Sequence, residues 1–125
     1  MSKSETVEAL VIRWLNDILA DYHASSDTPK TLPEHFVLVR RTGGNRVDLV
    51  GDAAEIQIEV YHKYSRADAA EIANYIADHI ETALPAEYED ITAAKVNSLI
   101  SLDDTERSYH RYQIYVDVFH VRAKD

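Results

Sequence analysis

The stretch VRRTGGNRVDLVGD (residues 39–52) sets two glycines between arginines and an alternating apolar segment, at the point where a sheet would begin. Residues 36–41 form a β-rich run, and residues 46–50 form a second one on the other side of TGGN. Glycines in so short a link supply the positive φ angles that a tight hairpin requires. The stretch therefore predicts a hairpin turn at TGGN, followed by a second turn at Gly51 and Asp52.

These glycines do not match a phosphate-binding loop. A Walker loop needs a Lys-Ser/Thr pair at the start of a helix, and a dinucleotide fingerprint needs three spaced glycines between a strand and a helix. TGGN instead joins two expected strands, so no helix amino terminus is available to bind an anion. We interpret the stretch as a turn and not as a ligand site.

A predicted strand follows this turn, and a predicted helix lies before it. After it, AEIQIEVYHKY (residues 54–64) alternates apolar and polar side chains, which predicts a third antiparallel strand with one buried face. Before it, an apolar stripe predicts a helix that starts near residues 2–4 and ends before the irregular connector SSDTPKTLPEH (residues 25–35). The stripe, with its tryptophan in the core, consists of Val7, Leu10, Val11, Trp14, Leu15, Ile18, Leu19 and Tyr22.

A second helix and two further strands complete the chain. Ser65 is the expected cap of this helix, and Pro85 is its expected end. Strands are predicted over residues 96–102 and 109–121, where apolar and polar side chains alternate. The resulting order, α-β-β-β-α-β-β, predicts a single α+β domain over residues 1–125, with a mainly antiparallel sheet flanked by helices.

The last expected strand has two unlike faces. The apolar face consists of Tyr112, Ile114, Val116 and Val118. The opposite face mixes aromatic and charged groups and consists of Arg111, Gln113, Tyr115, Asp117 and Phe119. A sheet face in contact with water is normally more uniformly polar, so we expect part of the mixed face to be covered. Another subunit or a helix of the chain itself would serve equally well as the cover.

Composition narrows the classes of function. The chain has 125 residues with 13 basic and 22 acidic side chains, and its net charge of −9 disfavours a protein that grips the phosphates of nucleic acid. It has no cysteine, which excludes disulfides and thiolate metal sites, and no apolar run of the roughly 20 residues that a membrane span needs. The start, MSKSETVEAL, lacks the apolar core of a signal peptide, so we do not expect secretion by that route.

No catalytic or cofactor-binding motif accompanies these elements. The six histidines are scattered without a short ligand pair such as HExxH, which disfavours a metal site. The acids within residues 87–90 and 103–106 are loop acids, which are usually solvated in so acidic a chain. No GxSxG elbow surrounds any serine. We therefore expect no enzyme, no catalytic residue, no metal and no cofactor.

Arginines and tyrosines are more informative, because both are over-represented at the energetic centres of protein interfaces. Three arginines flank the expected hairpin, and a second group of both types lies before and within the last strand. The interface candidates are Arg40, Arg41, Arg46, Arg107, Tyr109, Arg111 and Tyr115. Solvated charge is the alternative for the arginines, and core packing is the alternative for some of the tyrosines.

Five segments together resemble one protein family. They are WLNDIL (residues 14–19), FVLVRRTGG (residues 36–44), RVDLVGDAAEIQIEVY (residues 46–61), ADAAEIANYIADHI (residues 67–80) and DDTERSYHRYQIYVDVFHVR (residues 103–122). With these segments the chain is similar, over residues 7–122, to the tail terminator proteins of long-tailed bacteriophages, particularly those that infect actinobacteria. The most specific parts are the RRTGG hairpin, the strand over residues 52–60 and the segment over residues 107–115.

The resemblance implies a structural role in the virion. Tail terminators form a ring, usually hexameric, on the head-proximal end of the tail tube, where they stop tube polymerisation and present the surface that joins the head. The chain would then be a homo-hexamer whose partners are the tail tube protein and head–tail connector proteins. DNA would pass through its lumen without specific binding. The family's small sheet flanked by helices is shared with the tube protein and some connectors, so fold alone does not assign the position in the virion.

Two other functions stay open at this point. One is a head–tail connector or stopper protein of similar fold. The other belongs to a different class, a small cytoplasmic α+β enzyme or ligand-binding domain. On the ring hypothesis the candidate arginines and tyrosines become interface residues, and the resemblance does not say which of them contacts the tube, the head side or the neighbouring subunit. Arg41→Glu or Arg111→Glu is then expected to weaken assembly while the fold stays intact.

Overall fold

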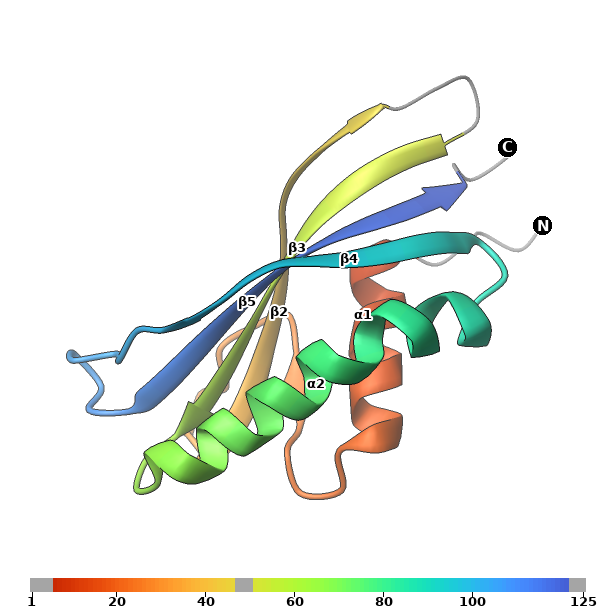
Figure 1. Cartoon of the computed structure of the whole chain (residues 1–125). Helices are drawn as coiled ribbons and strands as arrows, with labels where there is room; N and C mark the ends of the chain where they lie inside the picture. The colour runs from red at the N-terminus through yellow and green to blue at the C-terminus, as the bar shows by residue number, and fades with distance from the viewer. Residues whose placement is uncertain (1–5, 47–50, 122–125) are drawn as a thin grey trace.

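The computed structural model describes residues 6–46 and 51–121, which form two helices and one five-stranded sheet (Figure 1). The elements are α1 Val7–Ile18, β1 Ala24–Ser25, β2 His35–Arg46, β3 Gly51–His62, α2 Arg66–Glu87, β4 Ile91–Ser101 and β5 His110–Val121. The strands lie in the order β1-β2-β3-β5-β4, and all neighbours are antiparallel except β1 with β2. The predicted α+β class and element order are confirmed.

The glycines of TGGN lie inside β2 and do not form the predicted hairpin turn. Gly43 pairs with Glu55, and Gly44 pairs with Ala54, in the antiparallel ladder with β3. A β-bulge between Arg41 and Gly43 accommodates the glycines. A bulge adds one residue to a strand and bends it without reversing the chain, and glycine is a common residue at such sites.

The predicted second turn is wrong as well. Gly51 and Asp52 open β3 and pair with Val121 and His120 of β5. Two long strands therefore replace the predicted meander of three, and residues 47–50 of the predicted middle strand lie outside the described residues. The additional strand of the first half is β1, which ends at the first residue of the predicted connector, Ser25, and pairs in parallel with β2.

Both helices begin at side-chain caps. The Thr6 hydroxyl accepts a hydrogen bond from the Ala9 N–H at 3.1 Å, and α1 starts directly after it. The start expected near residues 2–4 lies outside the described residues. The Ser65 hydroxyl accepts a hydrogen bond from the Asp68 N–H at 3.0 Å, which confirms the predicted cap of α2.

Both helices end elsewhere than the sequence predicts. α1 ends at Ile18, and Tyr22 of its predicted stripe is a buried residue of the loop that follows the helix. α2 runs through Pro85 to Glu87. Proline removes one backbone hydrogen bond, but at this position the helix is already in its last turn, so little helix remains to be disrupted.

The core lies between the two helices and one face of the sheet (Figure 1). Trp14 is 4% exposed, which confirms its predicted place in the core. The fully buried residues of this core include Val11, Leu15, Ile76, Ile80 and Leu84 from the helices and Ile56, Ile58, Val60, Ile114, Val116 and Val118 from the strands. Burial stabilises each large aliphatic side chain by about 1.5–3 kcal/mol, so this layer dominates the stability of the fold. Three residues of the predicted apolar face of β5, Ile114, Val116 and Val118, are thus buried as predicted, whereas Tyr112 is half-buried and packs against the core.

The opposite side of the sheet, called here the helix-free face, carries neither α1 nor α2. Of the two covers that the sequence left open for the mixed face of β5, a helix of the chain itself is therefore excluded for the described residues. A small cluster covers only one end of this face, and it consists of Phe36, Leu38, Tyr61 and Tyr109 with Leu32 of the connector packed against it. Past that end, the side chains of the face are half-buried or exposed.

The sheet is strongly twisted, and residues 40–46 of β2 extend away from the helices (Figure 1). This segment is called here the arm. Residues 40–45 are all exposed. Within the described residues, neither helix is long and apolar enough to cross a lipid bilayer.

Candidate assembly interface

Side chains from four strands form a row across the uncovered part of the helix-free face. The strand register places Arg40, Gln57, Tyr115 and Ser98 side by side in this row. The Gln57 Nε2 donates a hydrogen bond to the Tyr115 hydroxyl at 3.1 Å. Arg40 is exposed and Tyr115 is half-buried, so two of the predicted interface residues share one open row.

The next row carries like charges on adjacent strands. Glu55 of β3 stands directly opposite Asp117 of β5, an arrangement that destabilises a sheet unless a cation is near. Lys95 of β4 stands on the other side of Asp117. The Thr42 hydroxyl donates a hydrogen bond to the Glu55 carboxylate at 2.7 Å. Both rows together give the uncovered face a mixture of aromatic, amide and charged groups.

The three arginines of the arm differ in their contacts. Within the residues that the structure describes, no hydrogen bond or ion pair restrains the Arg40 guanidinium. The Arg41 Nε donates a hydrogen bond to the Gly43 carbonyl at 3.1 Å, so this side chain folds back along its own strand. The backbone of Arg46 pairs with Asp52, and its side chain lies outside the described structure.

Arg111 is the centre of a polar network at the covered end of the helix-free face. Its Nη1 lies 3.5 Å from a carboxylate oxygen of Glu59 and donates a hydrogen bond to the Tyr61 hydroxyl at 3.4 Å. Its Nε donates to the Leu102 carbonyl at 2.8 Å, and Gln113 donates to the same Glu59 carboxylate at 2.7 Å. The side chains of Arg111 and Glu59 are only 19% and 7% exposed. The positive charge of Arg111 is therefore balanced by Glu59 of the same chain.

Arg107 and Tyr109 belong to the loop that leads into β5. The Arg107 N–H and guanidinium both donate hydrogen bonds to the Asp104 carboxylate at 3.2 Å. Tyr109 is 5% exposed, and its hydroxyl donates a hydrogen bond to the Pro33 carbonyl at 2.7 Å. The Tyr109 ring ties the connector to this loop and offers little area to a partner. Since Arg111 also lies 4.0 Å from Asp104, these residues form one group, separate from the arm.

A carboxylate from a helix reaches each long open edge of the sheet. Glu8 of α1 accepts a hydrogen bond from the Arg41 N–H at 2.9 Å, and Glu81 of α2 accepts one from the Val96 N–H at 2.7 Å. Both N–H groups lie beside β-bulges, where the regular ladder is interrupted. Sequence reasoning missed these contacts, because only the packing of the helices brings the paired residues together.

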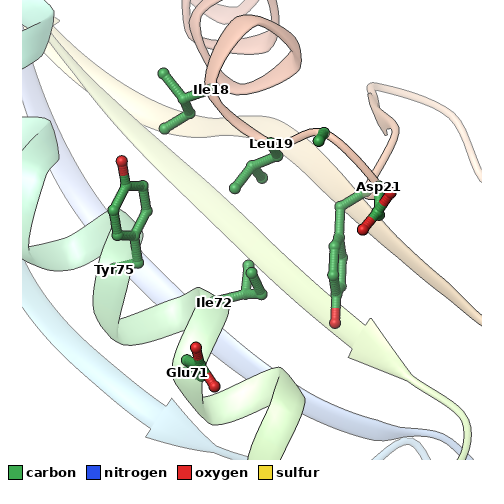
Figure 2. A pocket seen from close by; sticks show the side chains of 8 residues that line it. Ile18, Leu19, Asp21, Glu71, Ile72 and Tyr75 are labelled. Atoms are coloured by element: carbon green, nitrogen blue, oxygen red, sulfur yellow. The ribbon is translucent and has the colours of Figure 1, made fainter.

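A groove, also missed by sequence reasoning, lies between the end of α1 and the first half of α2 (Figure 2). It encloses about 260 Å³, and its lining consists of Ile18, Leu19, Ala20, Asp21, Tyr22, Glu71, Ile72 and Tyr75. A second lobe of about 230 Å³ shares four of these residues and extends to His35, His62 and Asp68. The one sequence signal of this groove is that Tyr22 continues the apolar stripe of α1 past the end of the helix.

The second lobe contains two stacked histidines. The rings of His35 and His62 lie 5.4 Å apart between centroids. The His62 Nδ1 accepts hydrogen bonds from the Tyr64 and Ser65 N–H groups at 3.1 and 2.9 Å, and the His35 Nε2 contacts the Asp21 carbonyl at 2.9 Å. Both rings therefore hold backbone segments. Among the described residues, no three potential metal ligands come together.

No family model matches the chain, and no curated protein matches its sequence.

Proposed function

We propose that this chain is a structural protein of a phage virion. Six copies of it would form a hexameric ring on the head-proximal end of the tail tube. The ring stops tube polymerisation and provides the surface that the head joins. The likeness of residues 7–122 to tail terminator proteins supports this role. The fold agrees with it, since a small sheet flanked by helices is what the resemblance implies.

The observation that carries the proposal is that the sheet is packed on one face and largely open on the other. The helices bury one face, whereas the row that holds Arg40 and Tyr115 remains accessible and the arm extends beyond the helices. Accessible aromatic and arginine side chains on an ordered sheet are typical of protein contacts. Because the arm and the helix layer are unlike surfaces, copies would associate head to tail, and such contacts form a ring when the rotation between neighbours closes.

The charge of the chain agrees with a ring that DNA traverses. With 13 basic and 22 acidic side chains, each copy carries a net charge of −9. A lumen lined by such chains repels the phosphate backbone, so DNA would pass without being held.

Tube assembly tests the proposal. Tail tube subunits from the same genome are polymerised alone and with the purified chain, and tube lengths and ends are measured by negative-stain electron microscopy. We expect shorter tubes with a ring at one end, together with rings of the chain alone in native mass spectrometry. An unrelated acidic protein of similar size is the control and should leave the tubes unchanged.

A chain that stays monomeric at high concentration and does not change tube length would contradict the proposal. A head–tail connector of similar fold would form rings that do not attach to tube ends, so the same images separate the two virion functions. A gene position between the head-completion genes and the tube genes would agree with the terminator role.

A further inference from the structure

The groove between α1 and α2 has the chemistry of a binding site for an arginine side chain. Figure 2 shows Asp21 and Tyr75 on opposite sides of it, with Leu19 and Ile72 between them and Glu71 beside Ile72. The apolar residues suit the aliphatic stem of an arginine, and the carboxylates suit its guanidinium. A planar guanidinium also stacks on aromatic rings, whereas the compact ammonium of lysine does not.

The negative potential of the groove acts on Tyr22. Burial and the charges of Asp68, Asp21 and Glu71 raise the pKa of the Tyr22 hydroxyl to about 12. Asp21 and Glu71 are exposed. No residue that the structure describes donates a hydrogen bond to either carboxylate or forms an ion pair with it. The groove therefore concentrates negative charge that its own chain does not balance.

The arm has the complementary chemistry. Residues 40–46 include three arginines and no acid, and Arg40 is exposed without a partner among the described residues. In Figure 1 the arm lies at the opposite end of the molecule from the loop that follows α1 and borders the groove. An arm therefore cannot reach the groove of its own chain, and a second copy would have to supply any groove that it enters.

We propose that the arm of one copy binds in the groove of a second copy, with Arg40 between Asp21 and Glu71. Each copy then uses its arm toward one neighbour and its groove toward the other, which is a head-to-tail contact. Complementary charge at this contact offsets the general repulsion between chains of net charge −9. The inference deepens the proposed function and rests on it for the closed ring, although the contact itself can be measured separately.

Charge exchange between the two surfaces tests the contact. Glu71→Lys and Arg40→Glu each change an exposed side chain without a partner among the described residues, so both variants are expected to fold, as circular dichroism and thermal unfolding can verify. Sedimentation velocity and native mass spectrometry measure self-association. Each single variant should weaken association roughly tenfold or more, and the double variant should regain most of it, because its charges are again complementary.

Asp78→Lys is the matched control, because Asp78 is an exposed acid of the same helix that does not line the groove. It should associate like the wild type. A folded Glu71→Lys variant that also associates like the wild type would overturn the inference. A wild-type chain without self-association would do the same, and so would a double variant that associates no better than the single ones.

The tube assay distinguishes this inference from the proposed function. Copies that associate through the groove but leave tail tubes unchanged support the inference and contradict the tail role. Rings that cap tubes and are indifferent to Glu71→Lys support the tail role and overturn the inference.

Discussion

At the scale of single residues, Arg111 holds the covered end of the helix-free face together. Its guanidinium contacts Glu59, the Tyr61 hydroxyl and the Leu102 carbonyl. It supplies the positive charge nearest to Glu59, whose side chain is almost completely withdrawn from water. Arg111→Glu would place two carboxylates side by side here. The sequence-based expectation that this change leaves the fold intact therefore does not agree with the position of the residue.

We expect Arg111→Glu to lower the free energy of unfolding by about 3 kcal/mol or more, because it removes one partner of a largely buried ion pair and adds a like charge. Arg40→Glu makes the same change at an exposed residue and should alter stability by no more than about 0.5 kcal/mol. Urea denaturation followed by circular dichroism measures both. Equal stabilities would mean that the network around Arg111 contributes nothing.

Gly44 is required by the backbone around it. Its φ angle is 148°, and a Cβ at this position would collide with the Ala53 carbonyl oxygen. We expect Gly44→Ala to destabilise the fold by about 1–3 kcal/mol. Gly43→Ala is the matched control, since its Cβ would meet nothing within 4 Å, and it should be close to neutral. Thermal unfolding measures the stability of both variants. A similar loss of stability in both would contradict the explanation.

The pKa of Tyr22 makes stability depend on alkaline pH. A tyrosine whose pKa is raised from 10.0 to about 12 in the folded state contributes stability that is fully present below pH 10.0 and is lost as the pH rises toward about 12. We expect the wild type to lose more stability than Tyr22→Phe across this window, and the two proteins to be similar at neutral pH. Denaturant unfolding at a series of pH values measures the difference. Parallel losses would contradict the expected effect of burial and of the nearby carboxylates.

At the scale of elements, the glutamates at the sheet edges limit pairing with other chains. Open edges present unpaired N–H and C=O groups that can recruit strands from elsewhere. The Glu8 carboxylate accepts a hydrogen bond from the Arg41 N–H on β2, and the Glu81 carboxylate accepts one from the Val96 N–H on β4. The bulges and the exposed Lys95 on β4 act in the same direction. Both open edges therefore offer fewer free N–H groups for strand pairing.

We expect Glu81→Ala to lower stability by about 1 kcal/mol, because a hydrogen bond from the Val96 N–H is lost, and to increase aggregation through β4. Asp78→Ala removes the same charge from the same helix and is the control. Light scattering and thioflavin T fluorescence at raised temperature compare the rates. If both variants aggregate at the same rate, the carboxylate of Glu81 does not protect the edge.

At the scale of the whole molecule, α2 and the arm differ in the charge of their own side chains. The solvent side of α2 is acidic, and its acids are Asp68, Glu71, Asp78, Glu81 and Glu87. Its one cation, Arg66, is already paired with Asp103 at 2.6 Å, and this pairing lowers the pKa of Asp103. The arm, in contrast, contains three arginines and no acid, and the acids opposite it, Asp52 and Glu55, belong to β3. On the proposed contact, this difference in charge would favour one orientation between copies with a net charge of −9.

The same charge distribution predicts weak interaction with DNA. We expect no saturable binding of a fluorescent DNA duplex at roughly 0.15 M salt, because a net charge of −9 opposes the phosphate contacts that dominate affinity. Fluorescence anisotropy measures this, with a basic DNA-binding protein as the positive control. Saturable binding that weakens steeply with salt would instead assign the arm arginines to phosphate contacts.

Much of the fold and part of the site could be predicted from local patterns. The Ser65 cap and the burial of Ile114 and Val116 follow from neighbouring residues and from two-residue alternation, and both are confirmed. The exposure of Arg40 and the partial exposure of Tyr115 are compatible with the predicted interface. The hydrogen bonds of Arg111 and Tyr109 to other residues of the chain could not be predicted, since their partners are up to 76 residues distant in the sequence.

The sequence by itself determined the α+β class, the order of the elements and the acidic charge, because caps, alternation and composition act over a few residues. Tertiary structure decided the rest. The bulge that carries TGGN through β2 exists because the ladder with β3 continues on both sides of the glycines. The groove and the capped edges arise where helices meet segments distant in sequence. Such contacts depend on packing geometry, which no local pattern encodes.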